Sequence, residues 1–175
     1  MRKIKLYIAI SLNGKIAKPD GSVDWLEAIP KPDNSDYGYT EFYDSVDTTI
    51  QGYNTYKKIQ SWGIEFPYKG KKNYVLTTDT TLNHNKDVQF VSKDHINFIK
   101  ALKKENGDDI WLIGGGKTNA SLLDAQLIDE LYVFVMPVVL NDGIDLFEDL
   151  VRDKSLILSR SKSYSTGVVE MIYHF

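Results

Sequence analysis

The stretch Ile110-Trp111-Leu112-Ile113-Gly114-Gly115-Gly116-Lys117-Thr118 decides how the chain is organised. Its first four residues are wholly apolar, which is typical of a central β-strand buried on both faces. Three glycines follow at once, and we expect a helix over about residues 118–126. Because glycine has no Cβ, backbone N–H groups in such a unit can approach an anion at the positive end of the helix. The stretch therefore predicts an α/β fold with an anion-binding turn.

Two familiar phosphate-binding motifs do not fit this turn. A Walker A loop ending at Lys117-Thr118 needs glycine at position 111, which is Trp111. A G-x-G-x-x-G fingerprint starting at Gly114 needs glycine at position 119, which is Asn119. The glycines by themselves therefore leave two readings open, an anion site and a tight turn without a ligand.

Strands and helices alternate outward from this stretch in both directions. Apolar residues at every second position predict a first strand over residues 3–10, and Leu131 to Met136 reads as a buried strand that Pro137 stops. The last twenty residues alternate twice around Ser165-Thr166-Gly167, which predicts a β-hairpin. Further strands are expected at 48–50, 74–76 and 88–91, helices at 37–46, 54–61 and 95–105 (with Asp94 as N-cap), and a loop at 13–21. The pattern predicts one α/β domain, residues 1–175, around a mixed sheet.

Composition excludes several kinds of chemistry. The chain has 175 residues and no cysteine, so disulfides, thiolate nucleophiles and Cys-ligated zinc or iron–sulfur clusters are absent. The three histidines are scattered and no H-E-x-x-H occurs, so we expect no metal site. The net charge of −3 gives no general attraction for nucleic acid or acidic membranes. The apolar run after Lys5 is too short for a signal peptide, so a cytoplasmic location is expected.

Charge is spread unevenly near the start of the chain. Residues 1–19 carry five Lys or Arg and no acid, whereas residues 20–50 carry eight acids and one Lys. One interpretation is a set of solvated loops and helix faces. The other is a cleft with an acidic wall toward the substrate and a basic wall toward a cofactor.

Several segments resemble a known family. The run Ile8–Ala17 (I-A-I-S-L-N-G-K-I-A) resembles the S-L-D-G-x-I-A opening of the dihydrofolate reductase-like superfamily. More narrowly, it resembles the reductase (C-terminal) domain of the bifunctional riboflavin biosynthesis deaminase–reductase and its stand-alone relatives. Other similar segments follow in the same order: Gly21–Leu26 (the loop that closes over nicotinamide and substrate), 52–56 (G-R-x-T-Y/W), 67–78, and 127–143 (L-I-D-E-L…P-x-x-L-G-x-G). The ordered set spans nearly the whole chain.

The resemblance implies a fold and an activity. The fold is a three-layer arrangement of a mixed, mostly parallel sheet of about eight strands, flanking helices and a C-terminal β-hairpin. The activity is NAD(P)H-dependent hydride transfer to a pterin- or pyrimidine-like heterocycle, as in 5-amino-6-(5-phosphoribosylamino)uracil reductase. Dihydrofolate reduction and a non-catalytic nucleotide-binding module of the same fold are the alternatives. Homodimers are common among such domains, so a homodimer is expected here.

The resemblance also implies which residues bind the cofactor. By motif position, Ala9 and Ile16 contact the nicotinamide and its carboxamide, and the first two glycines of the triplet share a cis peptide. Thr55 and the glycine turn hold the pyrophosphate, while Leu76 and the residues after it lie along the adenosine. The complete implied set is Ala9, Ile16, Gly52, Tyr53, Asn54, Thr55, Leu76, Thr77, Thr78, Gly114, Gly115, Gly116, Lys117 and Thr118.

One departure from the family bears on cofactor choice. Tyr53 stands where the family turn carries an arginine that clamps the 2′-phosphate of NADPH. A charge-assisted hydrogen bond typically contributes about 1.5–3 kcal/mol. NADPH is the expected cofactor, and NADH becomes possible unless Lys117 or another cation replaces the arginine.

The substrate side departs further from the family. Tyr7 stands where the riboflavin-pathway reductases have a lysine, and their Asp-x-Pro continuation after the turn is missing. For folate reduction, Asp36 is the candidate acid on the first helix, and Lys71 occupies the place of an arginine for the folate tail. Asp24, beside Trp25 in the closing loop, is a second candidate. The predicted catalytic residues are therefore Asp36 and Asp24, and the predicted substrate-binding residues are Trp25 and Lys71. An exposed acidic face is the other reading of Asp36 and its acidic neighbours.

Overall fold

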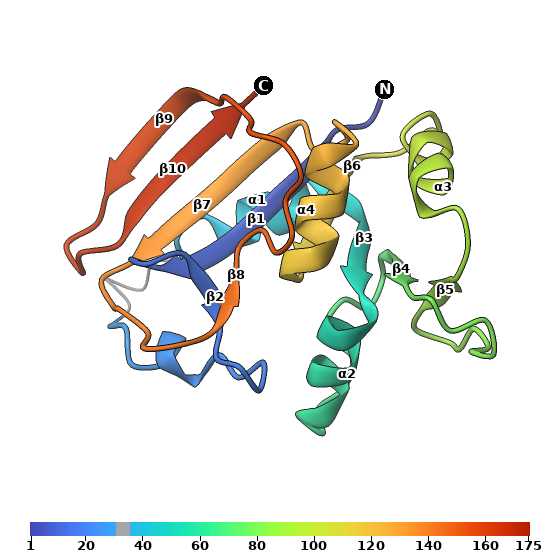
Figure 1. Ribbon diagram of the computed structural model, residues 1–175, viewed down its shortest axis with the longest axis horizontal. Coiled ribbons are helices and arrows are strands. Elements are labelled where there is room, and N and C mark those ends of the chain that lie inside the picture. Colours follow the sequence, from blue (N-terminus) through green and yellow to red (C-terminus); the bar gives the residue numbers. More distant parts are fainter. Residues whose placement is uncertain (31–35) are drawn as a thin grey trace.

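The computed structural model describes residues 1–30 and 36–175. Within these residues the chain forms one eight-stranded sheet, in the order β5-β4-β3-β6-β1-β7-β10-β9, and a two-stranded sheet (Figure 1). The large sheet contains β1 (Ile4–Ser11), β3 (Val46–Gly52), β4 (Lys72–Leu76), β5 (Gln89–Val91), β6 (Asp109–Gly114), β7 (Glu130–Met136), β9 (Ile157–Ser163) and β10 (Val169–His174). The small sheet pairs β2 (Lys15–Ala17) with β8 (Ile144–Asp145).

The large sheet is mixed but mostly parallel. The strands from β5 to β7 in the sheet order pair in parallel, and β10 pairs antiparallel with both β7 and β9. The carboxyl ends of the parallel strands therefore meet along one edge, which we call the carboxyl edge. The opposite side is the amino edge. The predicted mostly parallel α/β sheet and the C-terminal hairpin are both confirmed.

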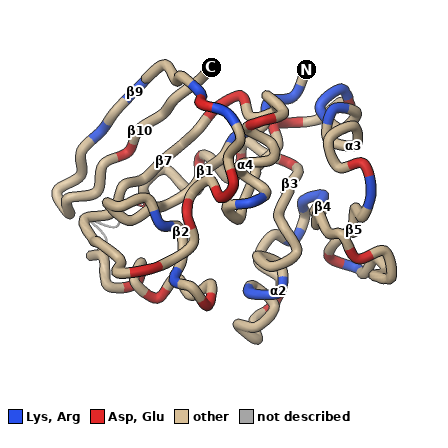
Figure 2. The backbone as a smooth tube through the Cα atoms, viewed as in Figure 1, with Lys and Arg blue, Asp and Glu red and all other residues tan. Residues whose placement is uncertain are grey.

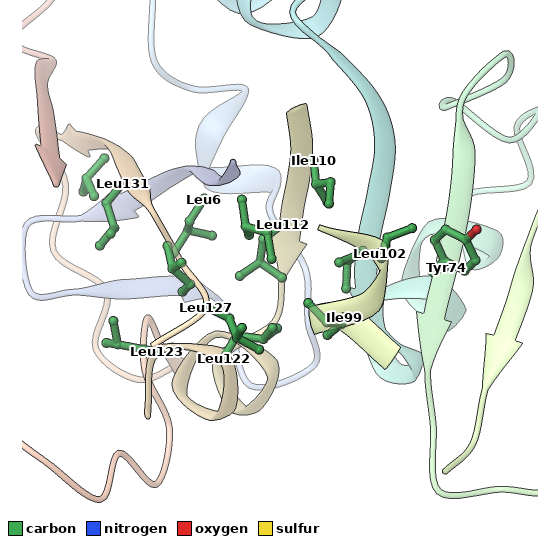
Figure 3. Packing of buried hydrophobic residues seen from close by; sticks show 14 residues of the cluster. Leu6, Tyr74, Ile99, Leu102, Ile110, Leu112, Leu122, Leu123, Leu127 and Leu131 are labelled. Carbon is green, nitrogen blue, oxygen red and sulfur yellow. The ribbon is translucent and has the colours of Figure 1, made fainter. Parts of the chain in front are cut away.

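Helices cover both faces of the sheet and complete three layers. They are α1 (Tyr39–Asp44), α2 (Tyr53–Ser61), α3 (His95–Leu102) and α4 (Gly116–Asp124), with a 3₁₀ turn at Asp24–Leu26. On one face, Leu6 and Leu112 of the central strands point toward Leu122 of α4 (Figure 3). On the other face, Val75 and Trp111 pack in a cluster with side chains of α1 and α2. Because side chains alternate between the two faces along each strand, the sheet contributes to a hydrophobic cluster on each face.

Four local expectations need correction. The first helix spans residues 39–44 rather than 37–46, and α4 begins at Gly116, two residues earlier than predicted. The expected loop at 13–21 contains β2, which is too short for its periodicity to be recognised. Asp94 occupies the N-cap position of α3, but its side chain makes no capping bond. Its carboxylate instead accepts a hydrogen bond from Asn97 Nδ2 at 3.0 Å.

Long apolar helices are missing from the described part of the chain, where no helix has the length and hydropathy needed to cross a membrane.

Candidate functional site

Two helix N-termini lie side by side at the carboxyl edge. β3 and β6 are parallel neighbours, and each leads directly into a helix, α2 at Tyr53 and α4 at Gly116 (Figure 1). Backbone N–H groups in the first turn of a helix have no intrahelical partner, and the helix dipole places positive charge there. The fold therefore brings the first-turn N–H groups of α2 and of α4 close together at the carboxyl edge.

Glycines allow these two turns to approach closely. A Cβ on Gly52 would lie 2.6 Å from Thr118 Oγ1, and a Cβ on Gly115 would lie 3.2 Å from Thr55 Oγ1. Gly114 has φ of 121°, which side chains rarely allow, and the Gly114–Gly115 peptide is cis, as the resemblance implies. We call Gly52, Thr55 and the segment 114–118 the glycine cradle. Larger residues at its glycines would fill it.

An acidic segment, residues 145–149, closes one side of the cradle. A Cβ on Gly116 would lie 2.7 Å from Glu148 Oε2, and the Glu148 N–H donates to Gly116 O at 3.2 Å. Lys15 Nζ holds this segment through Asp145 Oδ1 at 2.6 Å, beside the β2–β8 pair. Because Glu148 covers the Gly116 side, the side next to Thr55 is the one left for a ligand.

The residues predicted to contact nicotinamide reach the same place. Ile16 Cδ1 lies 4.0 Å from the position of a Cβ on Gly115, so β2 borders the cradle. Ala9 lies near the carboxyl end of β1, in register with Phe134 of β7. The structure therefore brings Ile16, Thr55 and Gly115 together, with Ala9 on an adjoining strand of the sheet.

The residues predicted to lie along adenosine follow β4, the next strand along this edge. Leu76 is half-buried and Thr78 is exposed. Thr77 is buried, and its N–H donates to Val91 O at 3.0 Å. Asn54, in the first turn of α2, is exposed. The adenosine candidates thus continue the row from the cradle toward β5.

Lys57 and Lys117, the two lysines near the starts of α2 and α4, have different neighbours. Lys57 Nζ stands 5.0 Å from the centroid of the Tyr53 ring, which also makes an edge contact with Phe90. Lys117 instead pairs with Asp149 at 3.4 Å and borders a hollow of about 430 Å³ on the outer side of α4. Lys57 therefore lies beside Tyr53, whereas Lys117 is paired with Asp149.

An aromatic cluster lines the α1–α2 face next to Ala9. Tyr7 stacks on Phe42 with ring centroids 4.3 Å apart, and its ring lies 4.7 Å from Phe134. Trp25, in the 3₁₀ turn, is 7% exposed and packs in a cluster with Phe134. The indole Nε1 of Trp25 has no hydrogen-bond partner among the described atoms. Phe42, Phe134 and Trp25 are thus buried, with the Trp25 N–H left unpartnered among the described residues.

Both candidate acids carry a lowered pKa. The Thr40 hydroxyl and backbone N–H lower the pKa of Asp36, whose carboxylate also accepts from the Gly38 N–H at 2.9 Å. The hydrogen bond from Lys18 lowers the pKa of Asp24, at a Nζ–Oδ2 distance of 2.9 Å. Both carboxylates are therefore ionised at neutral pH, a state that accepts hydrogen bonds but does not donate a proton.

Lys71 lies away from the cradle. Its ammonium donates to Tyr43 O at 2.8 Å and to Val46 O at 2.6 Å, and it stands 3.8 Å from the Tyr43 ring centroid. Val46 begins β3, so these contacts are at the amino edge. Burial lowers the pKa of Lys71. The structure does not bring Lys71 to the cofactor candidates, and its contact with substrate stays a prediction.

The early lysines and arginine are paired individually rather than gathered into a basic wall. Within residues 1–19, all described, each cation meets a different carboxylate: Arg2 with Asp47, Lys3 with Glu130, Lys5 with Asp109, Lys15 with Asp145, and Lys18 with Asp24. Figure 2 shows the two signs interspersed along the tube. These contacts favour individually paired charges over a basic wall, although the Arg2 side chain is buried rather than solvated.

Two buried amides beside the cradle were not singled out from the sequence. Gln51 is completely buried, and neither its Nε2 nor its Oε1 has a hydrogen-bond partner among the described atoms. Asn119 is also completely buried, and its Nδ2 donates to Leu146 O at 3.0 Å while its Oδ1 has no partner. Both adjoin Gly114, Gln51 by strand register and Asn119 by its side chain. A glutamine directly after the expected strand 48–50 and directly before Gly52 was the available signal.

Comparison with known proteins identifies the family. Residues 2–170 match the family described as the RibD C-terminal domain. The chain belongs to this family. It is 39% identical over 167 residues to the Bacillus subtilis protein YwjB, covering 95% of each chain. It is 30% identical over 188 residues to B. subtilis YyaP, covering 99% of this chain and 95% of that one. Both relatives are uncharacterised.

Solved structures share the fold. A putative riboflavin biosynthesis protein from Shewanella sp. PV-4 has a TM-score of 0.85 and 29% identity, covering 98% of both chains. A deaminase/5-amino-6-(5-phosphoribosylamino)uracil reductase from Thermotoga maritima has a TM-score of 0.75 and 16% identity, covering 99% of this chain and 56% of that one. A pyrimidine reductase-like protein from Corynebacterium diphtheriae has a TM-score of 0.64 and 14% identity, covering 99% and 91%. This family of reductase-like domains implies a nicotinamide cofactor for its members.

Metal ligation has no obvious place in this site. Across residues 1–30 and 36–175, no group of three or more His, Asp or Glu side chains is arranged to hold a metal ion.

Proposed function

We propose that this protein is a reductase that binds a nicotinamide dinucleotide along the carboxyl edge and reduces a pyrimidine- or pterin-like heterocycle. The glycine cradle is the observation that carries the proposal. It brings together the first-turn N–H groups of two helices, at glycines where an added Cβ would crowd Thr118, Thr55 or Glu148. A pyrophosphate is an anion that such donors bind.

The surrounding residues fit the remaining parts of a dinucleotide. Ile16 borders the cradle where nicotinamide would lie, and Leu76 to Thr78 continue toward β5 where adenosine would lie. The Gln51 amide and the Asn119 Oδ1 offer one donor and two acceptors that the described residues do not use. The bound cofactor supplies the hydride. The protein contributes position and exclusion of water.

The second reactant would lie against the aromatic cluster of Tyr7, Phe42, Phe134 and Trp25. Planar rings stack favourably on aromatic side chains, and this cluster adjoins Ala9. Asp24 and Asp36, ionised at neutral pH, act in this proposal as acceptors for ring N–H groups. The proton that accompanies hydride transfer then comes from water, because neither carboxyl holds one at neutral pH.

NADPH is the cofactor we propose, with Lys57 as the cation that receives its 2′-phosphate. Lys57 stands over the Tyr53 ring at the start of α2, where the family turn has its arginine. Because a lysine on a flexible stem holds phosphate as a point charge, it gives a weaker preference than a bidentate arginine. NADH therefore binds as well, with lower affinity.

The proposed substrate is a pyrimidine of the riboflavin-pathway type. The support is membership of the RibD C-terminal domain family together with the similarity to the putative riboflavin biosynthesis protein from Shewanella. A pterin is the alternative, although Asp36 lies in the loop before α1 rather than on the helix, where folate reduction requires its acid. A homodimer remains a prediction.

Turnover assays test the proposal. NADPH oxidation is followed with 5-amino-6-(5-phosphoribosylamino)uracil and, separately, with dihydrofolate. The proposal predicts oxidation that depends on the pyrimidine. Oxidation with dihydrofolate alone would identify a folate reductase, and cofactor binding without turnover on either compound would favour a non-catalytic nucleotide-binding module.

A further inference from the structure

Gln51 occupies an unusual position beneath the proposed cofactor site. It precedes Gly52 at the carboxyl end of β3, and it is in register with Val75 of β4 and with Gly114 of β6. The pairing with β6 is irregular here, so that Ile113 has no partner on β3. Gln51 thus adjoins two glycines of this region, one along its strand and one across the sheet.

The Gln51 side chain faces the α1–α2 layer. Residues in direct register on neighbouring strands share a face, and Val75 packs in the cluster that contains Tyr56 and Trp111. Gln51 is 0% exposed, and its amide nitrogen and oxygen both lack a partner among the described atoms. The described protein groups therefore do not replace the hydrogen bonds that this amide makes to water in the unfolded chain.

Thr49, two residues earlier on the same strand and face, shows how the protein satisfies a buried polar group. Thr49 Oγ1 donates to Asn73 Oδ1 at 2.7 Å. Asn73 Nδ2 lies within hydrogen-bond distance of three backbone carbonyls, those of Tyr68, Lys71 and Asp87. Only a few residues separate this satisfied network from the unsatisfied Gln51. The difference points to a partner for Gln51 that is not part of the protein.

We propose that Gln51 is a specificity-determining residue that recognises a planar amide edge, directly or through one ordered water. A primary amide offers one donor direction and one acceptor side by side, which matches a ligand group of the form –C(=O)–NH–. The nicotinamide carboxamide and the lactam edge of a pyrimidine or pterin both carry this group. The inference rests on the proposed function, because it takes both ligands from it.

The test compares Gln51→Met with Thr49→Val. Methionine fills similar volume without polar atoms, so the free protein keeps or gains thermal stability when an unpartnered amide is removed. Its affinity for the recognised ligand falls about tenfold, the loss of one net hydrogen bond. Thr49→Val has the opposite signature: lower thermal stability, because Asn73 loses its donor, and unchanged ligand affinity.

The ligands are chosen so that the source of the amide is distinguished. One arm measures dissociation constants of NADPH and of its 3-acetylpyridine analogue, in which a methyl group replaces the amide nitrogen. If Gln51 recognises the carboxamide, the wild-type preference for NADPH over the analogue disappears in Gln51→Met. The other arm measures 5,6-diaminouracil binding, which weakens about tenfold if Gln51 recognises the heterocycle.

Each outcome has a distinct meaning. If the wild-type protein binds the probes and Gln51→Met binds them with dissociation constants within twofold of the wild-type values, the role of Gln51 is overturned. The proposed function stays intact in that case. Failure of the wild-type protein to bind NADPH, NADH or the uracil would overturn both.

Discussion

The two edges of the central sheet treat buried polar groups in opposite ways. At the amino edge, the Arg2 side chain is 2% exposed and pairs with Asp47, and its Nη2 donates to Thr48 Oγ1 at 2.6 Å. Lys103, 6% exposed, pairs with Asp129 at 2.5 Å and donates to Leu127 O at 3.1 Å. Although Arg2 leaves Nη1 unpartnered, most of the charged atoms buried at this edge find protein partners.

At the carboxyl edge several buried polar atoms have no partner among the described residues, although others, such as Ser11 Oγ, are paired. The unpartnered atoms there include both polar atoms of the Gln51 side chain, Asn119 Oδ1 and Trp25 Nε1. Glycines replace side chains at the start of α2 and α4 on the same edge. We propose from this contrast that polar groups at the amino edge hold the fold together and that those at the carboxyl edge bind a ligand. The predictions below test this separation.

The largest expected effect is at the amino edge. Replacing Arg2 by Met removes the partner of Asp47, so the free energy of unfolding falls by roughly 2–3 kcal/mol, discounted because the Asp47 side chain is 32% exposed. NADPH affinity stays the same. Denaturant unfolding and NADPH titration measure the two quantities.

A matched control is Lys3→Met. The Lys3 side chain is 55% exposed in its pair with Glu130, so its loss costs less than about 1 kcal/mol. If Arg2→Met changes the affinity for NADPH and leaves the free energy of unfolding unchanged, the proposed difference between the amino and carboxyl edges is wrong.

The second effect belongs to the cradle. In Gly115→Ala, the new Cβ lies 3.2 Å from Thr55 Oγ1 and narrows the space for pyrophosphate. We expect NADPH affinity to fall at least about tenfold, which equals about 1.4 kcal/mol, with little change in thermal stability. Thr55→Ser keeps the hydroxyl and serves as the control. Unchanged NADPH binding by a folded Gly115→Ala protein would place the cofactor elsewhere.

The third effect concerns cofactor choice within the carboxyl edge. Tyr53→Arg supplies a bidentate cation at the start of α2, so the preference for NADPH over NADH rises about tenfold. Lys57→Gln lowers the same preference because it removes the cation over the Tyr53 ring. Lys58→Gln is the control, because Lys58 is adjacent in sequence but donates to Asp20 O at 3.1 Å. An unchanged ratio of dissociation constants in both Tyr53→Arg and Lys57→Gln would exclude α2 as the 2′-phosphate site.

The smallest effect is pH-dependent and concerns Asp36. Its carboxylate accepts N–H bonds from Gly38 and Thr40 before α1, and its pKa is lowered in the folded protein. The stabilisation is therefore present above the unfolded pKa of about 3.9 and is lost as the pH falls through the lower folded pKa. Asp36→Ala should lower the melting temperature slightly at pH 7, and the difference from wild type should shrink below about pH 4. A difference that does not vary with pH would contradict this assignment.

The sequence predicted the sheet well because its strands are strongly patterned. The alternation before Ser11 and the apolar run Ile110–Ile113 both became central strands, and the hairpin near the C-terminus is present. The short strand β2 was missed because it is defined by pairing with β8, more than one hundred residues away. Local patterns do not record such distant partners.

The candidate site was predicted only in part. Motif order located the glycines and Thr55, because glycine is needed where two backbones approach. Gln51 was missed, since a lone polar residue in a strand does not show whether its amide finds a partner. Lys71 was assigned by position in a motif, and its contacts with two backbone carbonyls depend on how α1 meets β3.

Hydrogen exchange with and without NADPH tests the central claim most directly. The claim is that a nicotinamide dinucleotide binds at the glycine cradle and nowhere near the amino edge. NADPH should slow exchange of the backbone amides at 52–55 and 114–118 and leave those at 103–109 unchanged. Protection confined to other segments, or none at saturating NADPH, would contradict the account.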